Sequence, residues 1–99
     1  MRAKLSGYRS AWRKTAELAL AIHALGEVAI GGSLIRRELA RAAGEALKTA
    51  DSVERTIYEA EFVERMKFHE VCERLNASQS YYYRARGGLL DRVAAKLKT

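Results

Sequence analysis

The 99-residue chain contains no proline, and this absence restricts its fold more than any other feature of the sequence. Proline ends or kinks helices, whereas alanine, leucine, arginine and glutamate, all frequent here, favour them. Hydrophobic residues make up 48% and charged residues 30% of the chain, as in a globular rather than a disordered protein. We therefore expect one all-α domain of about five helices over residues 1–99, with short connections and a small core.

In the first half of the chain, apolar residues recur every three or four positions, as they do in amphipathic helices. They predict a first helix from about Ser10 to Ala29 that ends at Gly31-Gly32 and carries Trp12 on its apolar face. Ser33 is a good N-cap for a second helix with an alanine-rich stripe. Small side chains allow close approach, so we expect residues 1–50 to provide helix packing and a homodimer contact that includes Trp12 and this stripe.

The second part, residues 51–99, begins with a helix-start signal. Asp51 or Ser52 can cap a third helix, and Glu54 lies three residues after Asp51, which is the spacing of a capping box. The apolar residues expected inside this helix are Val53, Ile57, Tyr58 and Phe62. We expect a turn at residues 65–67 to end it.

Two short helical patterns then meet at a three-residue joint. The first pattern places four apolar residues on one helix face, at Phe68, Val71, Cys72 and Leu75. Asn76 tolerates the left-handed conformation that ends a helix, Ala77 is small enough to turn inward, and Ser78 is a good N-cap. The inward side of the following helix is marked by Tyr82, Ala85, Leu89, Val93 and Leu97. This spacing is that of a helix-turn-helix.

The outward side of the second helix suits DNA. The first turns of such a helix can enter a major groove, which is about 12 Å wide, and reach base edges. No carboxylate that would repel phosphate lies between Glu73 and Asp91. The residues left for solvent or DNA in this stretch are Gln79, Ser80, Tyr81, Tyr83, Arg84 and Arg86.

The segment from about Ile57 to Leu97 resembles region 4 of bacterial sigma factors, and more closely the small ArpU-type phage transcriptional regulators. The matching residues are Phe68, Glu70, Val71, Cys72, Leu75, the joint at 76–78, Tyr83, Arg84, Leu89, Leu90, Val93 and Leu97. The resemblance covers roughly the last 40 residues and implies a C-terminal helix-turn-helix of this type.

The chain departs from the family pattern at two places. Asn76 stands where glycine is commonest, and Gly87-Gly88 interrupts the final helix. Each glycine lowers helix stability by about 1 kcal/mol relative to alanine. A kink or an early stop after Arg86 is therefore an alternative to a continuous final helix.

These patterns predict a sequence-specific, double-stranded DNA-binding transcriptional regulator of phage or prophage type. We expect the second helix to face base edges through Gln79, Ser80, Tyr81 and Arg84. We expect contacts to the DNA backbone from Lys67, His69, Ser78, Tyr83 and Arg86, where the assignment of Tyr83 rests on the family resemblance. One such module rarely binds tightly enough alone, so a homodimer or a contact with RNA polymerase is implied.

Two other functions fit the same patterns. One is a protein-interaction adaptor that binds a polymerase subunit or another regulator, with the helix-turn-helix as scaffold. The other is a phage DNA-packaging recognition subunit. Salt-dependent binding to duplex DNA separates the regulator from the adaptor. We expect no enzymatic activity, metal or cofactor, because no cluster of nucleophile, base and orienting group is found and His23 and His69 lack neighbours at metal-ligand spacing.

The net charge of +6 is unevenly distributed. Residues 1–50 carry nine basic and four acidic side chains, residues 51–64 carry one and five, and residues 65–99 carry eight and three. A basic C-terminal part suits DNA because phosphate neutralisation dominates nucleic-acid affinity. Charge alone is equally compatible with a basic surface that contacts only water.

Cys72 is the only cysteine, so no intramolecular disulfide can form and we expect a reducing compartment. The most apolar stretch, residues 16–30, is interrupted by Glu17, His23 and Glu27 and is too short to span a bilayer. The sequence therefore predicts a cytoplasmic protein without membrane contact.

Overall fold

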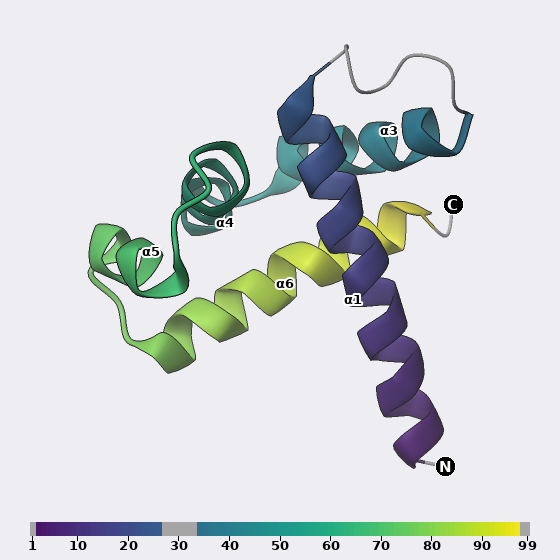
Figure 1. Cartoon of the computed structure of the whole chain (residues 1–99). Helices are drawn as coiled ribbons and strands as arrows, with labels where there is room; N and C mark the ends of the chain where they lie inside the picture. Colours follow the sequence, from purple (N-terminus) through teal and green to yellow (C-terminus); the bar gives the residue numbers. More distant parts are fainter. Residues whose placement is uncertain (1, 27–33, 98–99) are drawn as a thin grey trace.

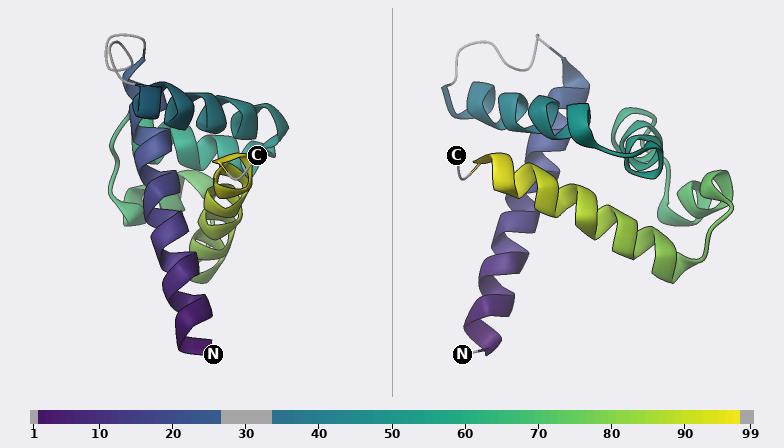
Figure 2. Two further views of the ribbon diagram at one scale, coloured as in Figure 1. Left: turned by 90° about the vertical axis from the view of Figure 1, so that its right-hand side faces the viewer. Right: turned by 180° about the vertical axis from the view of Figure 1, so that it is seen from behind.

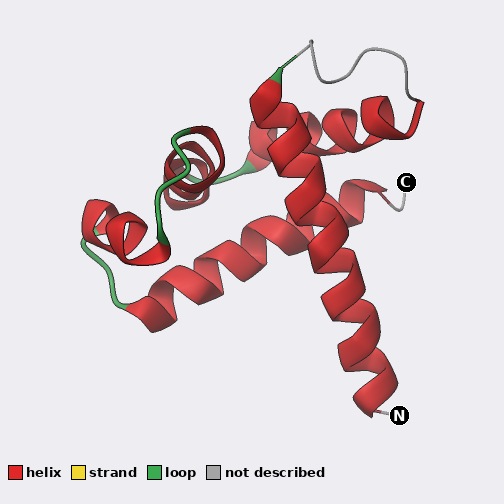
Figure 3. Ribbon diagram, viewed as in Figure 1, coloured by secondary structure: helices red, strands yellow, loops and turns green. Residues whose placement is uncertain are grey.

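The computed structural model describes residues 2–26 and 34–97, with side chains described from residue 11 onward. Within these ranges every regular element is a helix and no strand occurs, which confirms the all-α prediction. Figures 1 and 3 show the helices joined by short loops. The elements in chain order are α1 (Arg2–Leu25), α3 (Leu34–Thr49), α4 (Ser52–Ile57), the π-helix η1 (Tyr58–Val63), α5 (Phe68–Leu75) and α6 (Gln79–Leu97).

The first helix differs from the prediction at both ends. It begins at Arg2 rather than near Ser10, and it ends at Leu25 rather than at Ala29. Gly26 follows with a φ of +82°, a left-handed conformation that glycine adopts without the steric cost of a Cβ atom. The predicted stop at Gly31-Gly32 lies beyond this end and outside the described residues. The predicted N-cap Ser33 lies outside the described residues.

The core lies where α1, α3 and α6 pack against one another. Figure 2 shows from behind that α3 and α6 run side by side and that both cross α1. The side chains with no exposed surface there are Ala16, Ala19, Leu20, Ala42, Ala43, Ala46, Leu89 and Val93. The alanine-rich stripe of α3 is thus covered by the chain's own helices. The predicted homodimer contact through this stripe is wrong, and Trp12 is half-buried on α1.

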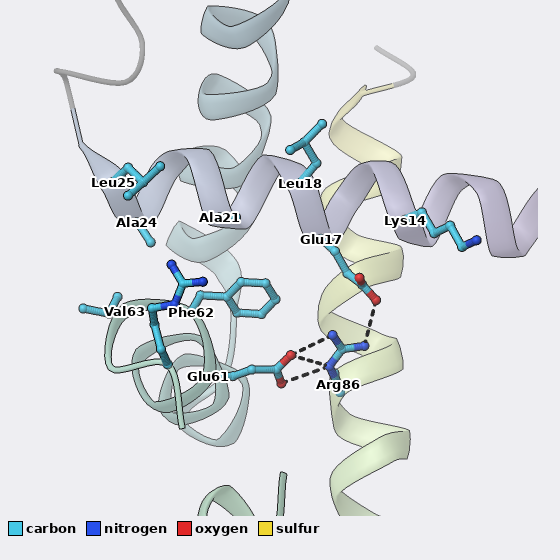
Figure 4. Close-up of a pocket in the computed structure, with 11 residues that line it drawn as sticks. Lys14, Glu17, Leu18, Ala21, Ala24, Leu25, Glu61, Phe62, Val63 and Arg86 are labelled. Carbon is cyan, nitrogen blue, oxygen red and sulfur yellow. Dashed lines mark hydrogen bonds and ion pairs between the residues drawn. The ribbon is translucent and has the colours of Figure 1, made fainter. Parts of the chain in front are cut away.

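The third predicted helix consists of α4 and η1, which follow each other without a break. The predicted capping box is confirmed: the Glu54 N–H donates to Asp51 Oδ1 at 2.8 Å, and the Asp51 N–H donates to Glu54 Oε1 at 3.1 Å. The sequence did not predict the π-helical second half. A π turn holds more residues than an α turn and so shifts the phase of the side chains that follow. Glu61 and Phe62 both point toward α1 and α6 (Figure 4).

The last helix runs through Gly87-Gly88 to Leu97, so the alternative of an early stop after Arg86 is wrong. Gly87 is buried, and a Cβ atom added to it would lie 3.0 Å from Nη2 of Arg13 on α1. Packing of α6 against α1 and α3 outweighs the roughly 2 kcal/mol of helix propensity that two glycines cost.

Candidate nucleic-acid interface

The joint between α5 and α6 has the backbone geometry that the sequence predicts. Asn76 has a φ of +53° and ψ of 48°, the left-handed conformation, and the Ala77 N–H donates to the Cys72 carbonyl at 3.0 Å. Ser78 Oγ accepts a hydrogen bond from the Tyr81 N–H at 3.1 Å, which satisfies one of the free donors at the start of α6. The predicted helix end and N-cap are confirmed.

Side chains at the inner side of the joint fix the angle between the two helices. Val71 of α5 is fully buried and Tyr82 of α6 is 2% exposed, as predicted for core residues. Cys72, Leu75 and Ala77 are half-buried. The short α5 is thereby held against the first half of α6.

Phe68 does not lie in the core as the sequence pattern predicts. It is 45% exposed, because the first turn of α5 extends beyond the packed helices. Its ring stacks on Tyr83, with centroids 6.3 Å apart and planes at 28°, and meets His69 edge-on at 5.7 Å. These three rings form an exposed aromatic edge where α5 and α6 meet.

The structure leaves eight of the nine predicted DNA-contacting residues exposed at the α5–α6 end of the molecule. They are Lys67, His69, Ser78, Gln79, Ser80, Tyr81, Tyr83 and Arg84. We call this set the α5–α6 surface. Figure 1 shows that it lies at the opposite side of the molecule from the N-terminal half of α1.

Two of the carboxylates near the α5–α6 surface, Glu64 and Glu70, have hydrogen-bond partners. Glu70 Oε1 accepts the Lys67 N–H at 3.0 Å. Glu64 forms a two-point ion pair with Arg74, and hydrogen bonding to that guanidinium holds the pKa of Glu64 below its usual value. Glu73, three residues after Glu70 on α5, is also exposed.

Arg86, the ninth predicted contact, is the exception, and its assignment to DNA is wrong. Its side chain is only 19% exposed and donates to Glu61 at 2.7 to 2.9 Å and to Glu17 at 3.1 Å (Figure 4). Tyr82 also donates its hydroxyl to Glu61, at 2.5 Å. Arg86 therefore ties α6 to η1 and α1 and has no donor directed at the α5–α6 surface.

The titration behaviour of this cluster agrees with a structural role. Burial alone lowers the pKa of Arg86, but the hydrogen bonds and charge of Glu61 more than reverse this, so that the pKa is raised. Burial, followed by the hydrogen bond to Glu61, raises the pKa of Tyr82. Both groups keep their protons throughout the physiological range.

A signal for the burial of Arg86 was present in the sequence. Arg86 lies four residues after Tyr82 and three before Leu89, so all three share the inward face of α6. Its acidic partners could not be found in this way, because Glu61 and Glu17 lie 25 and 69 residues away.

Two further ion pairs hold the second half of α6. Arg13 of α1 makes two hydrogen bonds of 3.1 Å to Asp91, and Arg92 contacts the buried Glu54 at 3.2 and 3.4 Å. Long-range charge pairs thus begin at Arg86 and continue toward the C-terminus. The first two turns of α6 are left to present their side chains outward on an anchored helix.

Comparison of the chain with protein-family models, with curated proteins and with solved structures gives no match. Among the described residues, no three histidine, cysteine or carboxylate side chains are grouped as a metal site requires. None of the described helices combines the length and the apolar character needed to cross a membrane.

Proposed function

We propose that the protein is a sequence-specific, double-stranded DNA-binding transcriptional regulator of phage or prophage type. In this proposal α5, the turn at 76–78 and the start of α6 form a helix-turn-helix of the sigma region 4 kind that the sequence resembles. One observation carries the proposal. The first two turns of α6 expose a polar, aromatic and cationic face without a carboxylate, on a helix held by ion pairs from Arg86 onward.

The outward side chains of α6 suit the base edges of a major groove. Glutamine can form two hydrogen bonds to adenine, and arginine can form two to guanine O6 and N7. Gln79 lies at the first position of α6, and Arg84 lies five residues later. With Ser80 and Tyr81 they form the base-reading part of the proposed interface.

The flanking residues suit the phosphate backbone. Four exposed donors flank the base-reading part. They are Lys67 and His69 at the start of α5, Ser78 at the cap of α6, and Tyr83 on α6 beside Phe68 of α5. Donors of this kind set the register and orientation of a protein on the duplex. Arg86 acts indirectly, since it positions α6 through Glu61 and Glu17.

A single module of this size binds DNA weakly, so the proposal includes a second contact. A homodimer on a palindromic site, or a contact with RNA polymerase, would supply it. The alanine stripe of α3 is excluded as the dimer contact by its burial.

Selection of bound duplexes from a random pool, followed by titration at several salt concentrations, tests this function. A recurring short sequence should emerge, and log affinity should fall linearly with log salt as phosphate counterions are released. If no sequence is enriched, or if the affinity does not depend on salt concentration, the proposal is rejected in favour of the protein-interaction adaptor.

A further inference from the structure

An open groove lies between α1 and η1, on a part of the molecule that the proposed DNA contact does not use. It has a volume of about 520 Å³. Figure 4 shows α1 along one side and η1 along the other, with Arg86 of α6 between Glu61 and Glu17. Its apolar lining consists of Leu18, Ala21, Ala24, Leu25, Phe62 and Val63.

Three large apolar side chains in this lining are exposed to an unusual degree. Leu18 is 52%, Leu25 is 64% and Val63 is 45% exposed. Lys14, Leu18, Ala21 and Leu25 follow one another at steps of four, three and four, so they form one stripe along the outer face of α1. A helix that packs alongside another helix meets a stripe with this spacing.

The groove lining carries three cations, Lys14, Arg65 and Arg86, and two carboxylates, Glu17 and Glu61, so its formal charge is positive. Glu17 and Glu61 both bind Arg86, so these three side chains together keep a single negative charge. Lys14 on α1 and Arg65, two residues after η1, also line the groove and are exposed. Within the described residues, neither of these two cations has an ion-pair partner. The groove therefore presents apolar surface together with a net positive charge, because Lys14 and Arg65 outweigh the negative charge that remains around Arg86.

We propose that this groove binds an amphipathic helix of another protein, with leucine-type residues facing the α1 stripe and acidic residues facing Lys14 and Arg65. The exposed leucines supply the apolar contact, and the two cations select the sign of the partner's charge. This site is independent of the DNA-binding proposal, because it shares no residue with the α5–α6 surface.

A second copy of the chain fits the groove less well than an acidic partner. In a two-fold dimer the same surface meets itself. Such pairing would bring two copies each of Lys14 and Arg65 to the interface, while the carboxylates of the groove are already bound to Arg86. Like charges at an interface oppose association.

A display library of helical peptides, with one face randomised among leucine, alanine, glutamine, glutamate and lysine, tests this proposal on the full chain. Selected peptides should combine leucines at helical spacing with flanking glutamates. Their affinity should fall about tenfold for Leu18→Ser and for Lys14→Glu, as expected when a central contact or a complementary charge is lost. Both positions are solvent-exposed, so the fold should be retained, and circular dichroism melting checks this.

Matched controls distinguish peptide binding in the groove from nonspecific apolar binding and from an effect of net charge. Leu34→Ser removes an exposed leucine of α3, and Arg37→Glu reverses an exposed cation of α3; neither should change peptide affinity. Failure to select any peptide, selection of lysine-rich peptides, or equal losses in the controls would overturn the proposal. Sedimentation that reveals a dimer dissociated by Leu18→Ser would also overturn it, since the occupant would then be a second copy.

Discussion

Arg86 is the residue on which the placement of α6 depends most. One guanidinium lies within hydrogen-bonding distance of carboxylates from two other helices, and it also sits 6.0 Å from the centre of the Phe62 ring. From the sequence alone, Arg86 looks like a DNA-contacting residue, because it is a cation in a basic stretch of the chain. Its position on the inward face of α6 gives it a structural role instead.

Replacing Arg86 by methionine should destabilise the fold. Glu61, only 18% exposed, would lose its partner, and breaking a partly buried pair should cost about 2 to 4 kcal/mol, somewhat less than for a fully buried one. Arg84→Met, on the outward face, should change stability by less than about 0.5 kcal/mol. Urea unfolding of the two variants measures the difference. Equal midpoints would contradict the role given to Arg86.

Tyr82 should make stability depend on pH in the alkaline range. Burial and the hydrogen bond to Glu61 raise its folded-state pKa, whereas tyrosine in an unfolded chain ionises near about pH 10. The folded state then retains a proton that the unfolded state loses, so stability falls as pH rises above about 10.

Tyr82→Phe should reduce this alkaline loss, although burial also raises the pKa of Tyr58, which will maintain part of it. At neutral pH the variant should be less stable by about 1 kcal/mol, because a hydrogen bond to Glu61 is lost. Unfolding curves at neutral and alkaline pH measure both effects. A parallel pH dependence in parent and variant would show that Tyr82 ionises normally.

At the scale of the helices, local signals predicted some boundaries and missed others. The Asp51–Glu54 capping box, the left-handed Asn76 and the Ser78 cap depend on neighbouring residues only, so the sequence reveals them. The continuation of α6 through Gly87-Gly88 depends on packing against distant helices, and the π-helical form of residues 58–63 has no signal in the apolar spacing. Propensity alone could not predict them.

The two glycines of α6 should respond differently to alanine. Gly88 is exposed, and a Cβ atom there would meet a single atom, Oε2 of the buried Glu54, at 3.3 Å, so Gly88→Ala should stabilise the protein by up to about 1 kcal/mol. At Gly87 the Cβ would meet three atoms of the Arg13 guanidinium at 3.0 to 3.4 Å, and the contact with Asp91 would be disturbed. Gly87→Ala should therefore increase the stability clearly less than Gly88→Ala does. Denaturant midpoints that rank the variants in the opposite order would contradict this packing.

At the scale of the whole molecule, the structure separates two surfaces. The basic C-terminal part presents the α5–α6 surface at one end, and the groove between α1 and η1 lies elsewhere. Sequence patterns predicted the first surface because its residues lie at the starts of two helices that are joined by a short turn. They could not predict the groove, since its walls come from residues 14–25 and 61–65, which only tertiary packing brings together.

If the start of α6 reads DNA, Arg84→Ala should weaken DNA binding without unfolding the protein. The variant should keep its fold and bind the selected duplex more weakly by about 1 to 3 kcal/mol if Arg84 reads a base. If Arg84 contacts a phosphate, binding should weaken on all sequences, and the salt-dependence slope should fall by about one. Arg37→Ala, which removes an equally charged and exposed residue from α3, is the matched control and should bind nearly as the parent does.

The measurement is the affinity of parent, Arg84→Ala and Arg37→Ala for the selected and a scrambled duplex at two salt concentrations. If α6 reads DNA, the loss of affinity for Arg84→Ala should clearly exceed that for Arg37→Ala. Binding of Arg84→Ala as tight as the parent's at both salt concentrations would contradict the claim that α6 enters the DNA groove.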